Sequence, residues 1–395
     1  MGITLVVNPG STSRKYVLYN GTDQLLELAF EQAGEGHEVC TRKEGVAQTC
    51  GSITDTEFSA AVQQVATETE KYLSQLSTTL DVIGVRVVAP GTHFQRHQII
   101  DDAFMYRLRQ IESAAPLHLP ALIREIDQLR LSFPGTPLIA VSDSAFHATM
   151  PTCARDYSLP QNDTEMYDIH RFGYHGLSVA SVLGGAATQL KYVPARVIVV
   201  HVGGGVSVTA VRDGKSIDTT MGFAPGSGLV MGSRGGDVDA GALLYLMQKS
   251  RLDPLAAEIV LQKQSGLYAL AGESDLRRLL ERQANGDVVA TSALTVLMYH
   301  LQKTIGGFAT VLGGLDAIVL TATAMERSAT LRSQLCLGLQ YPLGIQIGAE
   351  RNESIVGRDG IISSAGSAVP VVVVRTGEMF EIKRIAEAMV SADHI

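Results

Sequence analysis

A repeated pattern of strand, polar loop, strand and hairpin turn constrains the fold of this chain more than any other feature. Residues 3–21 and 197–214 each begin with an apolar, β-branched run and end in Asn-Gly or Asp-Gly, which are strong hairpin signals. From Asn8 in the first copy and from His201 in the second, the final glycine lies 13 positions further along. The copies are 201 − 8 = 193 residues apart. The repeat predicts a duplicated α/β unit whose two polar loops face a shared cleft.

Strand-like runs alternate with helical stretches along the whole chain, which is an α/β pattern. The clearest expected strands are residues 3–7, 16–19, 82–88, 138–141, 197–200, 206–211, 317–320 and 371–374. The expected helices are residues 55–76, 103–111, 119–131, 240–250, 274–285, 289–313 and 378–391. Residues 34–51 show little periodicity and are interpreted as a loop or hairpin.

Composition excludes several classes of protein. The chain has 395 residues, which predicts two or three domains. Its 32 basic and 40 acidic side chains give a net charge of −8, without the basic block that attracts nucleic acid or anionic membranes. No apolar stretch reaches the roughly 18 residues of a membrane span. The first residues, which lack a basic region, do not resemble a signal peptide or a myristoylation site.

The four cysteines are widely spread and have no CxxC spacing, so neither a disulfide framework nor a zinc site is expected. They are Cys40, Cys50, Cys153 and Cys336. We expect four reduced thiols in a cytoplasmic protein.

The 39 glycines exceed the roughly 28 that average usage would give. Glycine and small hydroxyl residues let backbone N–H groups approach an anion closely, as the two repeated polar loops require for binding phosphate. The alternative is that both loops are ordinary tight hairpins.

Four ionisable residues stand at strand ends or in glycine-rich loops, where sites in α/β proteins form. Arg86 lies within an apolar strand and needs an anionic partner or a ligand. Asp143 ends a strand, where it acts in a site or caps the next helix. His175 follows Gly173 and is either functional or a core histidine. Arg234, among glycines, favours anion binding.

At these residues the chain resembles the acetate kinase family. The resemblance covers nearly the whole chain, in order, and its opening segment is shared with butyrate kinases. The segments that carry it are residues 8–15 (NPGSTSRK), 141–151 (VSDSAFHATMP), 172–176 (FGYHG), 218–223 (DTTMGF), 231–239 (MGSRGGDVD), 265–267, 275–277 and 304–307.

The resemblance implies two actin-like (RNase H-like) domains of the acetate and sugar kinase type. Their expected bounds are 1–147 plus 378–395 for the N-terminal domain and 148–377 for the nucleotide-binding domain. It also implies reversible phosphoryl transfer between ATP and acetate or a similar acid, giving acetyl phosphate and ADP, with Mg²⁺ or Mn²⁺. A homodimer is expected from the family.

The family's active-site residues map onto the four residues singled out above. Arg86 and Arg234 are expected to clamp the carboxylate or acyl phosphate, because a planar guanidinium donates two parallel hydrogen bonds. His175 is expected to bond the transferred phosphoryl group, and Asp143 to orient an arginine or the carboxylate.

The resemblance also assigns binding residues. The metal is expected at Asn8 and Glu378. Phosphate is expected at a first loop with Ser11, Ser13 and Lys15 and at a second loop with His201, Gly203, Gly204 and Gly205. The nucleotide is expected near Asp275, Arg277, Thr323 and Met325, and the acyl group in a pocket of Val88, Leu117, Tyr174 and Pro225. Tyr174 stands where the family has Phe, which allows a small, more polar acyl group.

The chain departs from the family pattern at several positions. Gly204 and Leu119 each replace an asparagine, and Ala89 and Pro90 replace His and Gly. The family's Ala-Gly-Ile-Gly-Glu-Asn nucleotide loop reads ATAMER over residues 322–327, so both of its glycines are lost. Side chains at Thr323 and Met325 are expected to intrude on a nucleotide.

Two alternatives to an ATP-dependent carboxylate kinase therefore stay open. The first is the same acyl chemistry with pyrophosphate and phosphate in place of ATP and ADP. The second is a sensor or interaction protein that keeps the fold without kinase activity.

Overall fold

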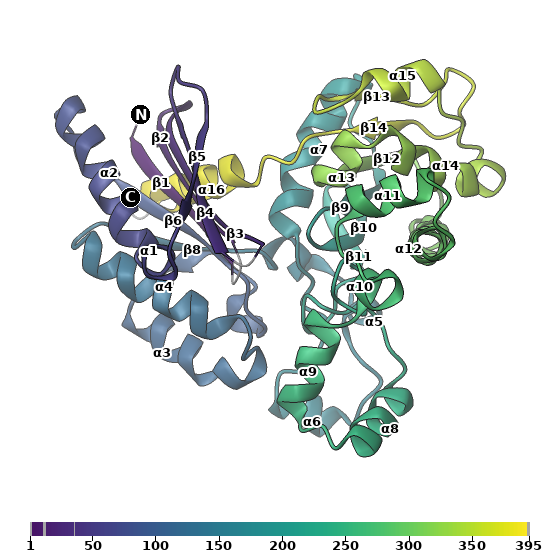
Figure 1. Cartoon of the computed structure of the whole chain (residues 1–395), viewed down its shortest axis with the longest axis horizontal. Coiled ribbons are helices and arrows are strands. Elements are labelled where there is room, and N and C mark those ends of the chain that lie inside the picture. The colour runs from purple at the N-terminus through teal and green to yellow at the C-terminus, as the bar shows by residue number, and fades with distance from the viewer. Residues whose placement is uncertain (1, 11–12, 35, 393–395) are drawn as a thin grey trace. The chain divides into compact units, whose positions relative to one another are not determined.

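The computed structural model describes residues 2–10, 13–34 and 36–392, and the chain divides into two compact units (Figure 1). Unit 1 consists of residues 1–145 and 378–395, and unit 2 of residues 146–377. Unit 1 thus takes its last helix from the far end of the chain. Each unit is built around its own mixed sheet.

Unit 1 contains an eight-stranded sheet in the order β5-β4-β3-β2-β1-β6-β8-β7. β1 is antiparallel to β2 and parallel to β6, which is parallel to β8. The elements of unit 1 are β1 (Ile3–Pro9), β2 (Ser13–Asn20), β3 (Asp23–Ala33), β4 (Gly36–Lys43), β5 (Thr49–Ile53), α1 (Asp55–Ser59), α2 (Ala61–Leu76), β6 (Val82–Val87), β7 (Gln98–Ile99), α3 (Asp102–Gln110), α4 (Leu119–Ser132), β8 (Leu138–Ser142) and α16 (Glu378–Ala392).

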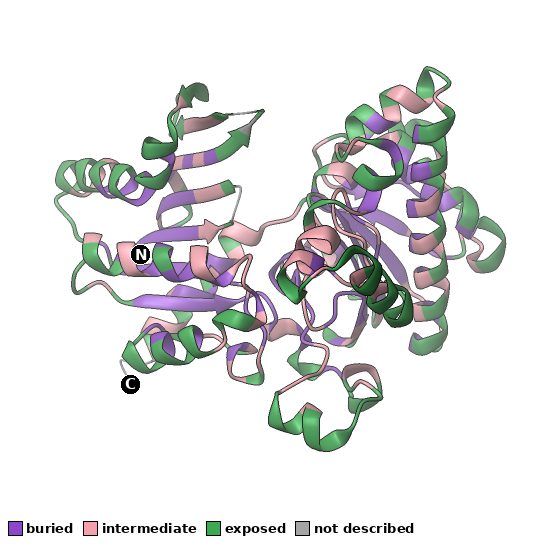
Figure 2. Cartoon of the chain, turned by 60° about the horizontal axis from the view of Figure 1, so that its bottom comes forward, coloured by how far each residue is buried: buried purple, intermediate pink, exposed green. Residues whose placement is uncertain are grey.

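Strand alternation sends successive side chains of this sheet to opposite faces. Leu5 and Val85 join the hydrophobic core that includes residues of α2, α3 and α4. On the other face, the Thr4 hydroxyl donates to Glu387 of α16 at 2.7 Å. Gly84 is close to Ile382 of α16, because a Cβ on Gly84 would lie 2.9 Å from its side chain. Helices thus cover both faces, and the strands between them are buried (Figure 2).

Unit 2 contains a six-stranded sheet in the order β11-β10-β9-β12-β14-β13. Apolar residues of α7 pack on one face of it, and the long α12 contacts β9 and β10. The elements of unit 2 are α5 (Thr152–Arg155), α6 (Gln161–Met166), α7 (Gly176–Leu190), β9 (Arg196–Val202), β10 (Val206–Arg212), β11 (Lys215–Thr219), α8 (Ala240–Ser250), α9 (Pro254–Lys263), α10 (Gly266–Ala271), α11 (Leu276–Ala284), α12 (Val288–Leu312), β12 (Ala317–Thr321), α13 (Ala322–Arg327), α14 (Ala329–Leu343), α15 (Ala349–Ser354), β13 (Gly360–Ile361) and β14 (Val371–Val373).

The two sheets share one topology, as the sequence repeat predicts. In each sheet an antiparallel pair, β1 with β2 or β9 with β10, contains one copy of the repeat. A third strand extends the antiparallel side, β3 in unit 1 and β11 in unit 2. Two parallel strands extend the other side, namely β6 and β8 in unit 1 and β12 and β14 in unit 2. The duplicated α/β fold is confirmed.

Several local predictions need correction. The helix expected over residues 55–76 is two helices, because Ala60 ends α1 and precedes α2 with non-helical torsions. For residues 34–51, where a loop or hairpin was expected, the structure confirms a hairpin, formed by β4 and β5. The prediction of four reduced thiols is wrong, since Cys40 and Cys50 are opposite each other in that hairpin and form a disulfide. Their ten-residue separation spans a turn that the sequence pattern did not locate.

α12, although 25 residues long, is not apolar enough to span a membrane, and none of the other helices in the described residues is both long and apolar enough to do so.

Candidate functional site

Arg86 projects from β6 on the face that α16 covers, and it is held by a carboxylate. Its Nε and Nη2 atoms donate to the two carboxylate oxygens of Asp143, both at 3.0 Å. Asp143 follows the end of the neighbouring strand β8 and is fully buried. Burial opposes the charged form of Arg86, but Asp143 and Glu378 outweigh it and raise the pKa of the guanidinium. The structure therefore fixes a permanent cation at the carboxyl end of two parallel strands.

Asn8 and Glu378 lie beside this cation. The Nη1 atom of Arg86 donates to the Asn8 side-chain oxygen at 3.2 Å, and Asn8 lies near the end of β1. Glu378 is the first residue of α16. An amide oxygen and one carboxylate are hard ligands of the kind that Mg²⁺ accepts together with water and phosphate. The donor set therefore fits the expected metal, although the described residues contain no group of three or more acidic, His or Cys ligands.

In unit 2, two histidines stack at the second polar loop. The rings of His175 and His201 have centroids 4.0 Å apart and are inclined by 26°. His175 Nδ1 is bonded to the Ser207 hydroxyl at 2.9 Å, and His201 Nδ1 to the Ser178 hydroxyl at 2.8 Å. These bonds fix the orientation of both rings and leave each Nε2 on the side away from its serine.

Glycines let the two imidazoles approach the loop backbone. A Cβ on Gly205 would lie 2.8 Å from His175 Nε2, and one on Gly203 would lie 3.6 Å from His201 Nε2. A Cβ on Gly204 would meet nothing within 4 Å. His175 itself has a left-handed backbone, with φ of 61°, where α7 begins. The loop therefore brings two imidazole edges to a glycine backbone, an arrangement suited to phosphate oxygens, although the Gly203 N–H donates to the Gly205 carbonyl at 2.9 Å within the loop.

The segment that replaces the family's nucleotide loop lies beside the same glycines. The backbone N of Thr323 would be 3.9 Å from a Cβ on Gly203, and the Thr323 side chain is exposed. Met325 is fully buried, and its carbonyl accepts from the buried Arg332 at 2.6 Å. The expectation that both side chains intrude on a nucleotide is therefore wrong for Met325, which packs into the protein interior.

Arg234 and the acyl-pocket residues are distributed over both units. Arg234 is half-buried and donates to the Pro225 carbonyl at 3.2 Å, which places these two predicted residues together in unit 2. Tyr174, also in unit 2, is buried, and its hydroxyl donates to the Phe223 carbonyl at 2.7 Å. Val88 and Leu117 belong to unit 1, and both are half-buried.

The remaining predicted binding residues are engaged in local contacts. Asp275 caps α11 and pairs with the exposed Arg277 at 2.6 Å, which lowers the pKa of the carboxyl group through their hydrogen bond. Lys15 pairs with Glu27 across the β2–β3 ladder at 2.8 Å. Ser13, the first residue of β2, is exposed, and Ser11 lies outside the described residues.

Sequence reasoning missed the serines that orient the two histidines. Ser207 is directly opposite His201 in the β9–β10 ladder, and Ser178 lies in the first turn of α7. The alternation of β10 marks Ser207 as a polar residue in a buried strand, which was the one available signal.

Comparison with known proteins assigns nearly the whole chain to a single family. The model of the acetokinase family matches residues 3–384. The acetate kinase of Micrococcus luteus is 36% identical over 394 residues, which cover 97% of this chain and 98% of that enzyme.

Solved structures agree with that match. The acetate kinase of Porphyromonas gingivalis has a TM-score of 0.85 at 30% identity, covering 99% of this chain and 100% of its own. A propionate kinase from Francisella tularensis subsp. tularensis has a TM-score of 0.89 at 30% identity, covering 98% and 100%. The expected two-domain kinase fold is thereby confirmed.

Proposed function

The chain belongs to the acetokinase family, whose members are phosphotransferases with a carboxyl group as acceptor, and from that premise we propose the reaction it catalyses. It transfers a phosphoryl group reversibly between ATP and a short-chain carboxylate such as acetate or propionate, forming the acyl phosphate and ADP. The observation that carries the proposal is the guanidinium of Arg86, fixed by buried Asp143 beside Asn8 and Glu378.

The arginines neutralise charge on the reacting groups. The bonds to Asp143 and Asn8 engage three of the five N–H donors of Arg86, and an anionic substrate takes its remaining donors. Arg234 supplies a second permanent cation. Phosphoryl transfer depends on alignment and on stabilising charge over three equatorial oxygens, so fixed guanidinium groups suit the reaction. Asp143 acts as a positioning residue that holds the plane of Arg86.

His175 donates a hydrogen bond to the transferred phosphoryl group. Its Nδ1 is engaged by Ser207, so Nε2 is the ring nitrogen that faces the phosphate loop. A donor that is already oriented contributes more to the transition state than one that must reorganise. His201 and the backbone of residues 203–205 bind the phosphates that do not move.

Glu378 and the side-chain oxygen of Asn8 would hold the metal ion. When bound, Mg²⁺ supplies positive charge at the phosphate oxygens of the nucleotide and keeps several of its waters. Asn8 is oriented for this role by its hydrogen bond from Arg86.

The family resemblance assigns the acyl group to apolar side chains of both units, Val88 and Leu117 in unit 1 and Tyr174 and Pro225 in unit 2. The Tyr174 hydroxyl is engaged by the Phe223 carbonyl, so the ring presents carbon atoms to an acyl group, as Phe would. This contact argues for acetate or propionate and against the more polar acid that the replacement of Phe by Tyr allowed.

ATP is the phosphoryl donor that the structure supports better than pyrophosphate. The burial of Met325 removes one of the two side chains that argued against a nucleotide, and Asp275 with Arg277 is retained. The exposed Thr323 is the feature that still favours the pyrophosphate alternative. The family resemblance further suggests a homodimer in the cytoplasm, and sedimentation of the purified protein tests whether it is a dimer.

A donor screen tests the proposal. Purified protein is incubated with acetate or propionate, Mg²⁺ and hydroxylamine, and with ATP, GTP or pyrophosphate supplied separately. Acyl hydroxamate with ATP is the expected result. Turnover with pyrophosphate alone would support the alternative donor, and no hydroxamate with any donor would favour the non-catalytic alternative.

A further inference from the structure

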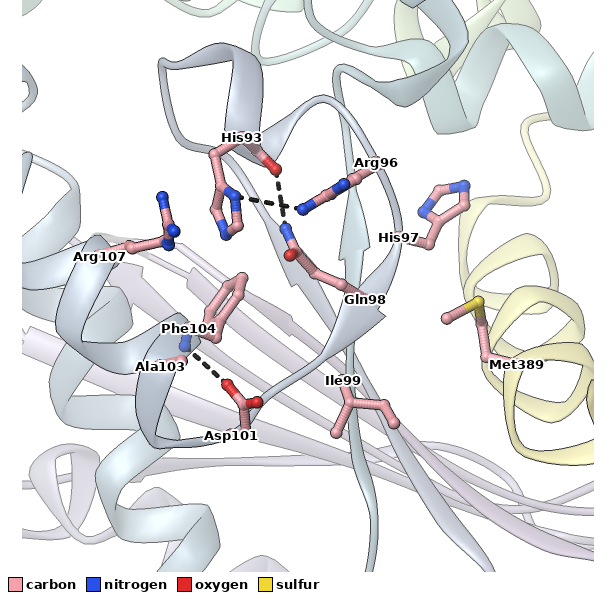
Figure 3. Close-up of a pocket in the computed structure, with 10 residues that line it drawn as sticks. All are labelled: His93, Arg96, His97, Gln98, Ile99, Asp101, Ala103, Phe104, Arg107 and Met389. Carbon is pink, nitrogen blue, oxygen red and sulfur yellow. Dashed lines mark hydrogen bonds between the residues drawn. The ribbon is translucent and has the colours of Figure 1, made fainter. Parts of the chain in front are cut away.

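A pocket in unit 1, apart from the residues assigned above, concentrates N–H donors (Figure 3). It has a volume of about 490 Å³ and is formed by residues 93–107 together with Met389 of α16. Its polar side chains come from the 3₁₀ turn Thr92–Phe94, from the segment that leads from this turn through β7, and from α3 with its N-cap Asp101. The chain as a whole carries a net charge of −8, so a local group of cations is notable.

His93 lies between two arginines in this pocket, as Figure 3 shows for Arg96 and Arg107. The Nη2 atom of Arg96 is 3.4 Å from His93 Nδ1. Because a guanidinium can only donate, Nδ1 accepts this bond and the ring proton is on Nε2. His93 Nε2 is buried and has no hydrogen-bond partner among the described residues. A buried N–H group without an acceptor is unusual and needs an explanation.

The two arginines also lack a carboxylate partner within the part of the chain that the structure describes. Nearby acidic side chains are otherwise engaged: Asp101 caps α3 by accepting from the Phe104 backbone N at 2.7 Å, and Asp102 pairs with Arg130. The positive charges lower the pKa of His93, after the larger effect of burial and against a smaller opposing effect of Asp101. The pocket therefore offers two cations and one neutral donor, and the one carboxylate in its lining, Asp101, has an oxygen engaged by the backbone of α3.

Apolar side chains form another part of the wall. Ile99 is 46% exposed, Phe104 is buried, and the Met389 side chain is drawn close to the cavity in Figure 3. Gln98 donates to the His93 carbonyl at 2.9 Å and so holds the turn against β7. A ligand with a charged head and an apolar body would contact both kinds of surface.

We propose that this pocket binds the phosphate dianion of a small phosphate ester, with Arg96, Arg107 and His93 Nε2 donating to its oxygens. Two guanidinium groups attract a dianion more strongly than a monocarboxylate, even with the single carboxylate of Asp101 in the same lining. Three donors from different directions also suit a tetrahedral anion better than a planar one. Ile99 and Met389 contact the organic part of the ester.

The test uses phenyl phosphate as the probe and follows the His93 Cε1–H signal by NMR, assigned through His93→Gln. We expect a saturable shift of this signal. Arg107→Gln should weaken binding about tenfold or more, the loss of one hydrogen bond to a charged group. The matched control is Arg109→Gln, which removes the same charge from α3 but at a residue paired with Asp127 outside the pocket, and it should bind as the wild type does.

Two further probes define the ligand class. If inorganic phosphate binds as tightly as phenyl phosphate, the site recognises the phosphate ion itself. If inorganic phosphate binds more weakly than phenyl phosphate, the site recognises a phosphate ester. The proposal is overturned if phenyl phosphate leaves the His93 signal unshifted, if benzoate binds equally well, or if both arginine variants bind alike. Urea unfolding of each variant distinguishes a lost contact from a lost fold.

Discussion

Arg86 combines two properties of a guanidinium, a permanent charge and a planar fork. Arg86→Lys keeps the charge and loses the two parallel bonds to Asp143. We expect kcat to fall about a hundredfold, as when one preorganised donor is removed. Because Asp143 keeps a cationic neighbour, the free energy of unfolding should change by less than about 2 kcal/mol. Steady-state kinetics and urea denaturation measure the two effects, and wild-type kcat in this variant would contradict the assignment.

Position 205 has no space for a side chain, because the imidazole ring of His175 lies against Gly205. In Gly205→Ala the new methyl group would lie 2.8 Å from His175 Cε1 and Nε2, so the imidazole must move from its position beside the loop. We expect kcat to fall by about tenfold or more, since misplacing a catalytic donor by about 1 Å has such effects.

The control for Gly205→Ala is Gly184→Ala, within α7. A methyl group there meets nothing within 4 Å, so activity should be unchanged, and the helix should gain up to about 1 kcal/mol of stability. An equal kcat for the Gly205→Ala and Gly184→Ala variants would contradict the role assigned to His175.

Glu125 introduces a pH dependence of stability. Burial raises the pKa of this carboxyl group, against the opposing effects of Tyr16 and Arg14. Between the ordinary carboxyl pKa and this raised value, the folded state holds a proton that the unfolded chain has lost. The free energy of unfolding should therefore fall as pH rises through that window.

Glu125→Gln cannot titrate, and Tyr16 can still donate to its amide oxygen. Relative to the wild type, this variant should become more stable as pH rises above about 4.3. Urea unfolding at a series of pH values measures the difference, and parallel curves for the two proteins would argue against it.

The sequence revealed site residues where a charge interrupts an apolar run, as at Arg86. It could not reveal Ser178 and Ser207, because their contacts with the two histidines arise only when α7 and β10 pack together. Nor could it show the direction of the Met325 side chain. Met325 lies in the short helix α13, which begins at Ala322 with φ of 68°, and both of these side chains are buried.

At the scale of elements, buried runs of β-branched residues were predicted as strands, whereas β3, which is rich in Leu, and the exposed strands β4 and β5 were missed. β1 and β9 are buried runs of β-branched residues, which local pattern identifies. β4 and β5 are mostly exposed or half-buried at the edge of the sheet, and their sequences lack clear alternation. Their pairing depends on β3, which supplies the adjacent edge.

The disulfide between Cys40 and Cys50 should stabilise this β4–β5 hairpin. It closes a loop of sequence separation 10, for which the entropic effect is about 2–3 kcal/mol. We expect dithiothreitol to lower the urea midpoint of the wild type and to leave a Cys40→Ser/Cys50→Ser variant unchanged. Activity should persist in the variant, because the hairpin holds none of the assigned site residues. An unchanged midpoint on reduction of the wild type would argue against the bond.

At the scale of the whole molecule, duplication explains both the architecture and the two loops. The repeat detected at Asn8 and His201 marks equivalent hairpins in two sheets of the same topology. What the repeat could not predict is that α16 returns from the end of the chain to cover β1, β6 and β8. That return places Glu378 close enough to influence Arg86, although 292 residues (378 − 86) separate them in sequence.

The central claim is that this chain transfers a phosphoryl group from ATP to a short-chain carboxylate. The most direct measurement is hydroxamate formation with acetate or propionate, ATP and Mg²⁺, for the wild type and for Arg234→Ala. We predict acyl hydroxamate with the wild type and a loss of about a hundredfold or more in the variant. No hydroxamate from the wild type with either acid, or undiminished turnover in the variant, would contradict this account.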